Sequence, residues 1–536
     1  MGTKPAKTPA KREGFSSRRV FLFAAIGSAV GLGNIWRFPA VAYKNGGGAF
    51  MIPYIVALLT AGLTFLFFDY AIGHRGRASS PLAFRRLNRK TEFIGWWHMG
   101  ISAVIAIYYA AVIAWAVRYM IFSFNQEWGS DAKTFFMKDF LKVGDPKLSF
   151  DFNPGILIPL VLVWISLIVI MALGVQKGVG AANVVFMPLL IFMFVGLVAY
   201  SLTLPGAMNG LNTLFTPNWG ALTNGEVWVA AYGQIFFSLS IGFGIMVTYA
   251  SYLKPKTDLT GSGAVVGFAN SGFELLAGIG VFAALGFMAQ AQGIAVDKVV
   301  EEGIGLAFIA FPTIISQAPA GALIGFLFFG SLLFAGFTSL ISILEVIIAG
   351  VQDKAGTSRL TSTMIVIIPL AIISTLLMPT ASGLYMLDIL DTFVNNFGIL
   401  AAGLTSIVVI TYGVRALPTL REHLNSVSSF KVGWIWMILL AGVTPLILGY
   451  SLISTLVKTI NKPYGGYPAD LLGIFGWGMV ALLVISSIVI SFLPWSHKSR
   501  AAEEPPAPPV IGGKLAHTHV DDAALKAHAK TQGEEA

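Results

Sequence analysis

Gly27-Ser-Ala-Val-Gly-Leu-Gly-Asn34 interrupts the first apolar segment of the chain, which runs from residue 18 to residue 42. Three glycines, a serine and an asparagine stand near the middle of a stretch that is otherwise suited to a membrane helix. Glycine is common in transmembrane helices and lets backbones approach closely, so helix packing is one interpretation. The neighbouring hydroxyl and amide favour a broken helix whose free backbone groups line a polar cavity.

A second apolar segment, residues 226–252, is interrupted in a similar way. Its middle reads Ser238-Leu-Ser-Ile-Gly-Phe-Gly244, with two glycines beside hydroxyl side chains, and Gln234 precedes it by about one turn. Secondary transporters contain inverted repeats with discontinuous helices, whose N-terminal ends attract anionic groups and whose free carbonyls coordinate cations. Two such breaks predict one site for a zwitterion and Na⁺.

The composition is that of a membrane protein. Of 536 residues, 56% are hydrophobic and 11% are charged, against roughly 25% charged in soluble globular proteins. Apolar stretches of about 20 residues, the length that crosses a bilayer as a helix, recur along the chain. We predict an all-α integral membrane domain over residues 18–494 with twelve spans, at 18–42, 47–73, 95–123, 155–173, 180–203, 226–252, 262–291, 321–352, 360–379, 385–413, 433–457 and 469–494.

The net charge of +9 is concentrated beside the first two spans. Basic residues precede the first span and follow the second: Lys4, Lys7, Lys11, Arg12, Arg18 and Arg19, then Arg75, Arg77, Arg85, Arg86, Arg89 and Lys90. The positive-inside rule and an even number of spans predict that both termini are cytoplasmic. Residues 1–17 would form an N-terminal tail and residues 495–536 a disordered C-terminal tail. Lipid headgroups account for the charge, so we expect the bilayer and no nucleic acid as partner.

The parts of common catalytic sites are missing from the sequence. It contains no cysteine and no His-Glu-x-x-His motif, which excludes disulfides, thiol catalysis and that type of zinc site. We therefore predict that the chain is not an enzyme and holds no organic cofactor.

Longer motifs resemble the signature of the neurotransmitter:sodium symporter family. The first is the run from Gly27 to Pro39, followed by Lys44-Asn-Gly-Gly-Gly-Ala-Phe50. Further matches are Ile107-Tyr-Tyr109, Gly233-Gln-Ile-Phe-Phe-Ser-Leu-Ser240, Asn270 and Phe334-Ala-Gly-Phe-Thr-Ser339. The resemblance implies the leucine-transporter fold, a 5+5 inverted repeat of spans 1–5 and 6–10 in which spans 1 and 6 are broken. It also implies a sodium-coupled amino acid carrier in a bacterial cytoplasmic membrane.

The resemblance further implies two sodium sites. Sodium 1 would be held by Ala29, Asn34, Ser238 and Asn270. Sodium 2 would be held by Gly27, Val30, Ala335, Thr338 and Ser339. These positions offer carbonyl, amide and hydroxyl oxygens, which suit a hard cation. Without the resemblance, the hydroxyls of Thr338 and Ser339 would be interpreted as bonded back to their own helix.

Eleven residues are implied to bind the substrate: Ala29, Leu32, Gly33, Ile105, Tyr109, Phe237, Ser238, Ser240, Phe243, Ser339 and Ile343. The amides of Leu32 and Gly33 and the hydroxyl of Tyr109 would hold the carboxylate. The side-chain pocket is mostly apolar and uncharged, which favours a small neutral amino acid such as leucine, methionine or alanine. Monoamine carriers of the family have an aspartate at the position of Gly31, so the glycine argues for a substrate with its own carboxylate.

Glu274 is a carboxylate inside the seventh predicted span, four residues after Asn270. Such a residue is costly in a membrane and indicates a function. Chloride-dependent relatives carry a small hydroxyl residue at this position. The resemblance therefore implies chloride independence, with Glu274 supplying the charge beside Tyr54 and Gln234 and returning protonated in a proton antiport. The structural alternative is a carboxylate that only bonds its neighbours.

Two gates are implied by charges at opposite ends of the spans: Arg37 with Asp391, and Arg12 with Asp353. Exposed ion pairs are worth only about 0–1 kcal/mol, so they can open and close during alternating access. Three further acidic residues lie in or near spans: Asp69, Glu345 and Asp388. The sequence does not identify their partners.

An amino-acid-binding sensor or a channel on the same fold is the alternative function, since a fold does not determine a function. We predict that a monomer suffices for transport, with a dimer or a small accessory subunit left open.

Overall fold

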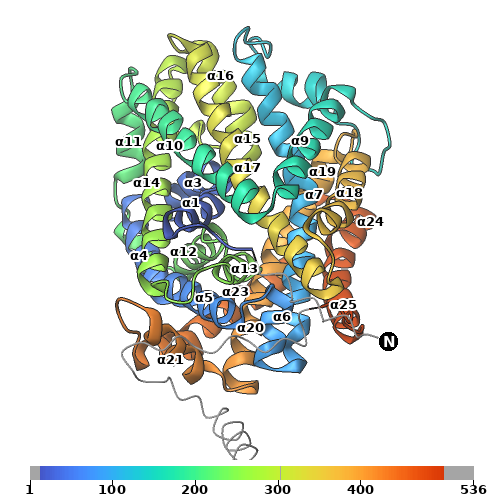
Figure 1. Cartoon of the computed structure of the whole chain (residues 1–536). Helices are drawn as coiled ribbons and strands as arrows, with labels where there is room; N and C mark the ends of the chain where they lie inside the picture. Colours follow the sequence, from blue (N-terminus) through green and yellow to red (C-terminus); the bar gives the residue numbers. More distant parts are fainter. Residues whose placement is uncertain (1–12, 302, 500–536) are drawn as a thin grey trace, which may run out of the picture.

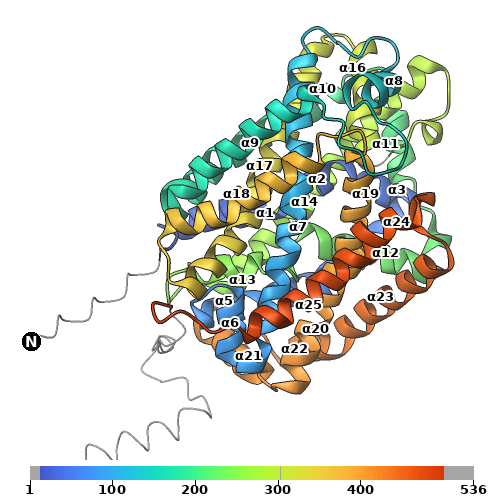
Figure 2. The ribbon, with the colours of Figure 1, turned by 90° about the vertical axis from the view of Figure 1, so that its right-hand side faces the viewer.

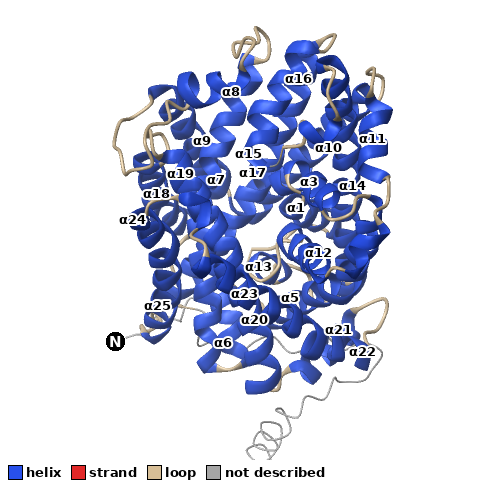
Figure 3. Ribbon diagram, turned by 180° about the vertical axis from the view of Figure 1, so that it is seen from behind, coloured by secondary structure: helices blue, strands red, loops and turns tan. Residues whose placement is uncertain are grey.

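A computed structural model describes residues 13–301 and 303–499 of the chain. Helices α1 (Arg18–Ala29) and α13 (Ile245–Ala250) lie in the middle of a helical bundle (Figure 1). Over the described ranges the structure is built of helices and loops, with two isolated β-bridges and no strand (Figure 3). The prediction of an all-α membrane fold is confirmed.

Ten helical stretches in the described part are long and apolar enough to span a membrane: Gly48–Gly76, Arg89–Phe122, Pro154–Ala172, Val175–Ser201, Leu259–Gln292, Gly321–Ala355, Arg359–Leu377, Gly383–Gly413, Trp434–Gly466 and Ala469–Phe492. Each coincides with a predicted span. The first predicted span is a bent pair, Arg18–Ala29 and Leu32–Lys44, whose parts meet at 51°. The sixth is divided into α12 (Gly225–Ser238) and α13, so the total of twelve stays a prediction, as does the inverted repeat.

The bundle also contains these helices: α2 (Leu32–Trp36), α3 (Phe38–Lys44), α4 (Met51–Ala57), α5 (Leu63–Gly76), α7 (Glu92–Phe122), α9 (Pro154–Ala172), α10 (Ala181–Ser201), α14 (Leu259–Gln292), α17 (Gly321–Ala355), α18 (Arg359–Leu377), α19 (Gly383–Phe393), α20 (Leu400–Val408), α23 (Thr444–Asn461) and α25 (Met479–Phe492). The connections contain shorter helices: α6 (Ser80–Leu87), α8 (Ala132–Thr134), α11 (Ala207–Phe215), α15 (Gly303–Gly305), α16 (Phe311–Gln317) and α21 (Leu417–Val427).

Both breaks have backbone conformations that end a helix. Between α1 and α2, Val30 and Gly31 are extended. Between α12 and α13, Ser240, Gly242 and Gly244 have positive φ values of 53°, 81° and 88°. Glycine adopts this left-handed region without a steric penalty, which explains two glycines in this short stretch. The carbonyls and amides of both breaks are thus released from regular helical bonding.

The two ends of the bundle differ. Helices α8 and α16 lie at one end, and α6 and α21 lie at the other (Figure 2). At the α6 end, Phe15 is buried with edge-on ring contacts to Phe21, Tyr249 and Tyr252, at centroid distances of 5.8, 5.4 and 6.0 Å. This aromatic cluster closes the α6 end of the bundle.

The segment after α25 also packs on the α6 end. The indole of Trp495 donates to Glu92 over 3.0 Å, and the amide of Ser496 donates to the carbonyl of Lys354 over 3.1 Å. Both Trp495 and Ser496 belong to the predicted C-terminal tail, and here they pack on the bundle. The rest of that tail, and residues 1–12 of the N-terminal one, lie outside the described residues.

Candidate functional site

A cavity of about 690 Å³ lies where the two breaks meet α7, α17 and α19. All eleven residues predicted to bind substrate line it, together with Ser28, Gly31 and Asn34 of the first break. Its size is within the range of small-molecule sites. The lining continues past Phe136 and Met137 to Gly303 and Ile304, so the cavity extends from the breaks toward the end of the bundle that carries α8 and α16.

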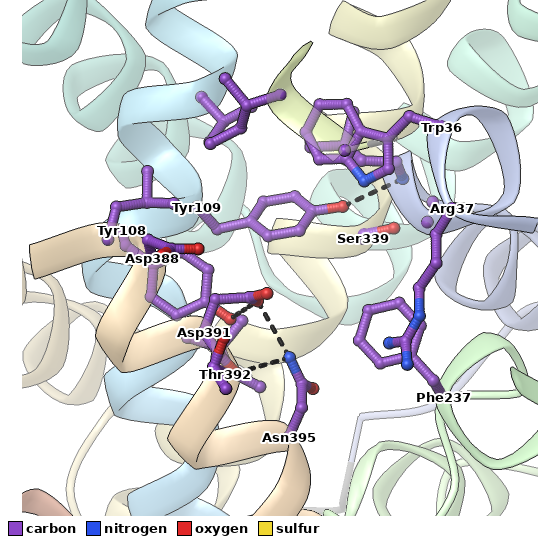
Figure 4. Close-up of a pocket in the computed structure, with 18 of the residues that line it drawn as sticks. Trp36, Arg37, Tyr108, Tyr109, Phe237, Ser339, Asp388, Asp391, Thr392 and Asn395 are labelled. Atoms are coloured by element: carbon purple, nitrogen blue, oxygen red, sulfur yellow. Dashed lines mark hydrogen bonds between the residues drawn. The ribbon is translucent and has the colours of Figure 1, made fainter. Parts of the chain in front are cut away.

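The start of α2 faces the cavity beside an aromatic hydroxyl. The amide of Leu32 donates a hydrogen bond of 3.4 Å to the hydroxyl oxygen of Tyr109, which points into the cavity (Figure 4). A methyl group on Gly31 would lie 2.9 Å from Oγ of Ser339 and 3.2 Å from the Tyr109 hydroxyl. Gly31 therefore leaves a small polar space between α1, α7 and α17. The roles of these residues in substrate binding stay a prediction.

Three of the four residues predicted for sodium 1 form one buried chain of hydrogen bonds. Nδ2 of Asn34 donates to Oδ1 of Asn270 over 2.8 Å, and Nδ2 of Asn270 donates to Oγ of Ser238 over 3.0 Å. Oδ1 of Asn34 accepts from the Gly31 amide over 2.9 Å. The fourth residue, Ala29, lines the adjoining cavity. The structure thus gathers amide and hydroxyl groups of α2, α12 and α14 next to the first break.

The residues predicted for sodium 2 lie where α1 packs on α17. Oγ of Ser339 lies 3.5 Å from the carbonyl oxygen of Gly27 and 3.4 Å from that of Ser28. The Thr338 hydroxyl donates to the carbonyls of Phe334 and Ala335 in its own helix, each at 3.0 Å. Ser339 therefore bridges the two helices, whereas Thr338 has the local bond that its position in a membrane helix allows.

Glu274 is fully buried between three polar side chains. Its Oε1 accepts from Nε2 of Gln234 over 2.6 Å, and its Oε2 accepts from the hydroxyl of Tyr54. That hydroxyl also lies 2.9 Å from Oγ of Ser271. Tyr54 and Gln234 are the neighbours that the resemblance implies, and Ser271 is a further one, one turn from Glu274 along α14.

The residues of the outer predicted gate face each other across the cavity (Figure 4). The guanidinium carbon of Arg37 lies 4.7 Å from the ring centroid of Phe237. Asp391 accepts hydrogen bonds from the hydroxyl of Tyr108 over 2.6 Å and from Nδ2 of Asn395 over 2.9 Å.

Asp353 belongs to the inner predicted gate. Its side chain is buried and accepts a hydrogen bond of 2.8 Å from the backbone amide of Ser79. Arg12, its predicted partner, lies outside the described residues. Both gate pairs stay predictions.

The cavity is also lined by a polar cluster around Asp388, whose partners the sequence does not identify. Asp388 accepts from the hydroxyls of Tyr464 and Tyr467 over 3.1 and 2.7 Å, which ties the connection after α23 to α19. Only the motif Ile107-Tyr-Tyr109 draws attention to Tyr108 in the sequence. No motif or spacing marks Tyr464 and Tyr467 as residues of the site.

Comparison with known proteins gives the family. The model of the sodium:neurotransmitter symporter family matches residues 12–130 and 126–498. An uncharacterized sodium-dependent transporter of Methanocaldococcus jannaschii is 39% identical over 482 residues, which cover 90% of this chain and 97% of the relative. The sodium- and chloride-dependent glycine transporter 2 of Xenopus laevis is 28% identical, over 88% of this chain and 68% of its own length. The chain is a multi-pass membrane protein that belongs to the sodium:neurotransmitter symporter family.

Proposed function

We propose that this chain couples the entry of Na⁺ to the uptake of a small neutral amino acid by alternating access. Membership of the family makes it a sodium-dependent transporter. The substrate, the ion sites and the coupling are the parts that we propose.

The observation that carries the proposal is the convergence of both helix breaks on one cavity. Residues of both breaks, among them Ala29, Leu32 and Phe237, line that cavity next to the buried amide chain of Asn34 and Asn270. Carbonyl and amide oxygens are suitable ligands for Na⁺, and amide nitrogens at the start of α2 are suitable donors to a carboxylate. A carboxylate beside the ion would make the binding of substrate and Na⁺ mutually favourable.

A neutral side chain fits the remaining walls best. The side-chain pocket is made by Ile105, Phe237, Phe243 and Ile343, with the Ser339 hydroxyl as its polar group. A charged substrate side chain would lose its hydration without a partner of opposite charge there. Leucine, methionine and alanine are the candidates, and one methylene distinguishes them by only about 1–3 kcal/mol.

Glu274 supports a carrier that works without chloride. Its carboxylate is buried beside Tyr54 and Gln234, so a negative charge near the sodium 1 residues would be part of the protein. A second anion in the same place would be opposed by electrostatic repulsion. We propose that Glu274 replaces chloride and that it returns protonated when the site is without substrate.

The difference between the two ends of the bundle supports alternating access. The cavity extends toward the α8 and α16 end, while the Phe15 cluster fills the α6 end. By the positive-inside rule, the basic residues around α6 support a cytoplasmic location for this end. We therefore propose that the described conformation is open to the outside of a bacterial cytoplasmic membrane.

Uptake into proteoliposomes tests the proposal. Radiolabelled leucine, methionine and alanine are offered to purified full-length protein, with an inward sodium gradient, with equal sodium on both sides, and with potassium replacing sodium. We expect accumulation only with the sodium gradient, unchanged when gluconate replaces chloride. Binding without uptake would indicate a sensor, and uptake that never exceeds equilibration would indicate a channel; either result contradicts the proposal.

A further inference from the structure

We infer that the side-chain oxygen of Asn183 is a ligand of a cation site between α1, α10 and α17. The inference rests on the proposed sodium coupling and adds a residue, and a third helix, to the ions' binding region. These three helices pack directly on one another.

The orientation of the Asn183 amide is determined by its own helix. Asn183 is fully buried on α10, and its Nδ2 donates to the carbonyl oxygen of Val179 over 2.9 Å. Exchanging the amide oxygen and nitrogen would place two oxygens against each other, so the chemistry requires Nδ2 at Val179. Oδ1 must then point away from it.

Oδ1 of Asn183 points at the first helix break. A methyl group on Gly27 would lie 2.6 Å from this oxygen and 3.2 Å from Cβ of Thr338. Only a residue without a side chain lets the amide oxygen come so close to the backbone of α1. The carbonyl oxygen of Gly27 is itself 3.5 Å from Oγ of Ser339. Oxygens of three helices therefore gather around one glycine.

Nothing in the described part of the chain donates a hydrogen bond to Oδ1 of Asn183. The hydroxyl of Thr338, whose Cβ also lies beside Gly27, donates to carbonyls of its own helix. A buried acceptor without a partner is costly and requires an explanation. A cation or a water molecule would provide one.

The charge of the cluster favours a monovalent cation. Gly27, Asn183, Thr338 and Ser339 offer only neutral oxygens, whereas protein sites for Ca²⁺ and Mg²⁺ normally include carboxylates. Na⁺ is the cation that the family uses. With Asn183 as a ligand, binding of Na⁺ would hold α10 against α1 and α17, in addition to joining the latter two.

Sodium-dependent thermal stabilisation of the purified full-length protein tests the inference. In Asn183→Leu, which keeps the size and removes the oxygen, we expect about a tenfold higher sodium concentration for half-maximal stabilisation, the effect of losing one good polar ligand. In Asn183→Asp, which keeps an oxygen and adds a negative charge, the half-maximal concentration should be lower than in the wild type. Ser201→Ala is the matched control, because Ser201 also lies on α10 with a buried hydroxyl that lacks a partner among the described residues.

The outcomes separate this inference from the proposed function. A wild-type protein that sodium fails to stabilise would contradict both. The inference alone would be overturned if sodium stabilises the wild type and Asn183→Leu with the same half-maximal concentration and the same preference between Na⁺ and Li⁺. If the leucine variant does not fold, the same comparison is made with Asn183→Asp. An unchanged half-maximal concentration would leave a water molecule as the partner of Asn183.

Discussion

The hydroxyl of Ser240 donates a hydrogen bond of 2.9 Å to the carbonyl oxygen of Ser28. Ser240 stands in the second break with a φ of 53°, and Ser28 stands at the end of α1, 212 residues away in the chain. This bond joins the two breaks directly. Because the Ser28 carbonyl lies beside the predicted ligands Gly27 and Ala29, the bond also determines how the first break presents its carbonyls to the cavity.

Ser240→Ala should weaken substrate binding about five- to tenfold, since one buried hydrogen bond contributes about 1 kcal/mol. Equilibrium binding of the transported amino acid at saturating sodium measures the effect. Ser331→Ala is the matched control, because Ser331 is buried on α17 and donates only to Leu327 of its own helix. Equal affinities of wild type and Ser240→Ala would show that the link between the breaks is dispensable.

The breaks themselves were predictable from sequence because their signal is local. Glycines and small polar residues stand within eight positions of one another at Gly27 to Asn34, inside a segment that is otherwise apolar. The span boundaries follow for the same reason, since hydropathy changes at each helix end. The short connecting helices α8, α15 and α16 were not predicted, because each is too short to show a periodic apolar face. Helices α11 and α21 were also not predicted, although α21 buries Leu417, Leu420, Leu424 and Val427 at helical spacing.

The polar contacts of the site were predictable only where a family motif marked them. Glu274 and Gln234 are 40 residues apart, and Asp388 and Tyr467 are 79 residues apart. The first pair came from the resemblance and the second was missed, because no spacing rule relates residues on different helices. Glu345 was noticed without a partner for the same reason: Arg359 is close in sequence but lies on the next helix.

Asn270→Ala should raise the sodium concentration for half-maximal binding about tenfold. Asn270 links Asn34 to Ser238, so its loss removes one predicted ligand and leaves Nδ2 of Asn34 without its acceptor. Substrate affinity should fall at low sodium and recover at high sodium, as thermodynamic linkage requires. Sodium titrations of substrate binding measure both effects.

Asn425→Ala is the control for this substitution, because both amide bonds of Asn425 go to the backbone of Val432 near the α21 end. A loss of substrate affinity in Asn270→Ala that high sodium does not restore would argue for a purely structural role of the amide chain.

Glu274→Ser should make uptake depend on chloride. The substitution removes the buried negative charge beside Tyr54 and Gln234 and leaves room and donors for an anion. Uptake in chloride and in gluconate, for wild type and variant, is the measurement. Glu226→Ser, which removes an exposed carboxylate bonded to Lys458, should leave uptake indifferent to chloride. An active Glu274→Ser that works equally in both anions would exclude Glu274 as the substitute for chloride.

Gly31→Ala should reduce substrate affinity at least about tenfold without preventing folding. The added methyl group would enter the polar space between Ser339 and Tyr109, at 2.9 and 3.2 Å from their oxygens, where the substrate carboxylate is proposed to bind. Gly272→Ala is the control, since a methyl group there meets nothing within 4 Å on helix α14. This control should bind normally and be equally or slightly more stable, because alanine favours a helix by about 1 kcal/mol over glycine. Normal affinity in Gly31→Ala would move the substrate site away from this glycine.

Arg359→Met should lower the thermal midpoint strongly, whereas the double variant Glu345→Met with Arg359→Met should recover most of the loss. Glu345 accepts two hydrogen bonds from Arg359, of 2.8 and 2.6 Å, and one of 2.6 Å from Tyr252 in the cluster that closes the α6 end. Removing one partner of a buried ion pair costs about 3–5 kcal/mol because the other charge stays buried alone, while an apolar pair of similar size is often neutral. Lys458→Met is the matched control: its ion pair with Glu226 is exposed and worth about 0–1 kcal/mol. A double variant as unstable as Arg359→Met would mean that Tyr252 needs the Glu345 carboxylate itself, so that this acid, and not the ion pair, holds the α6 end closed.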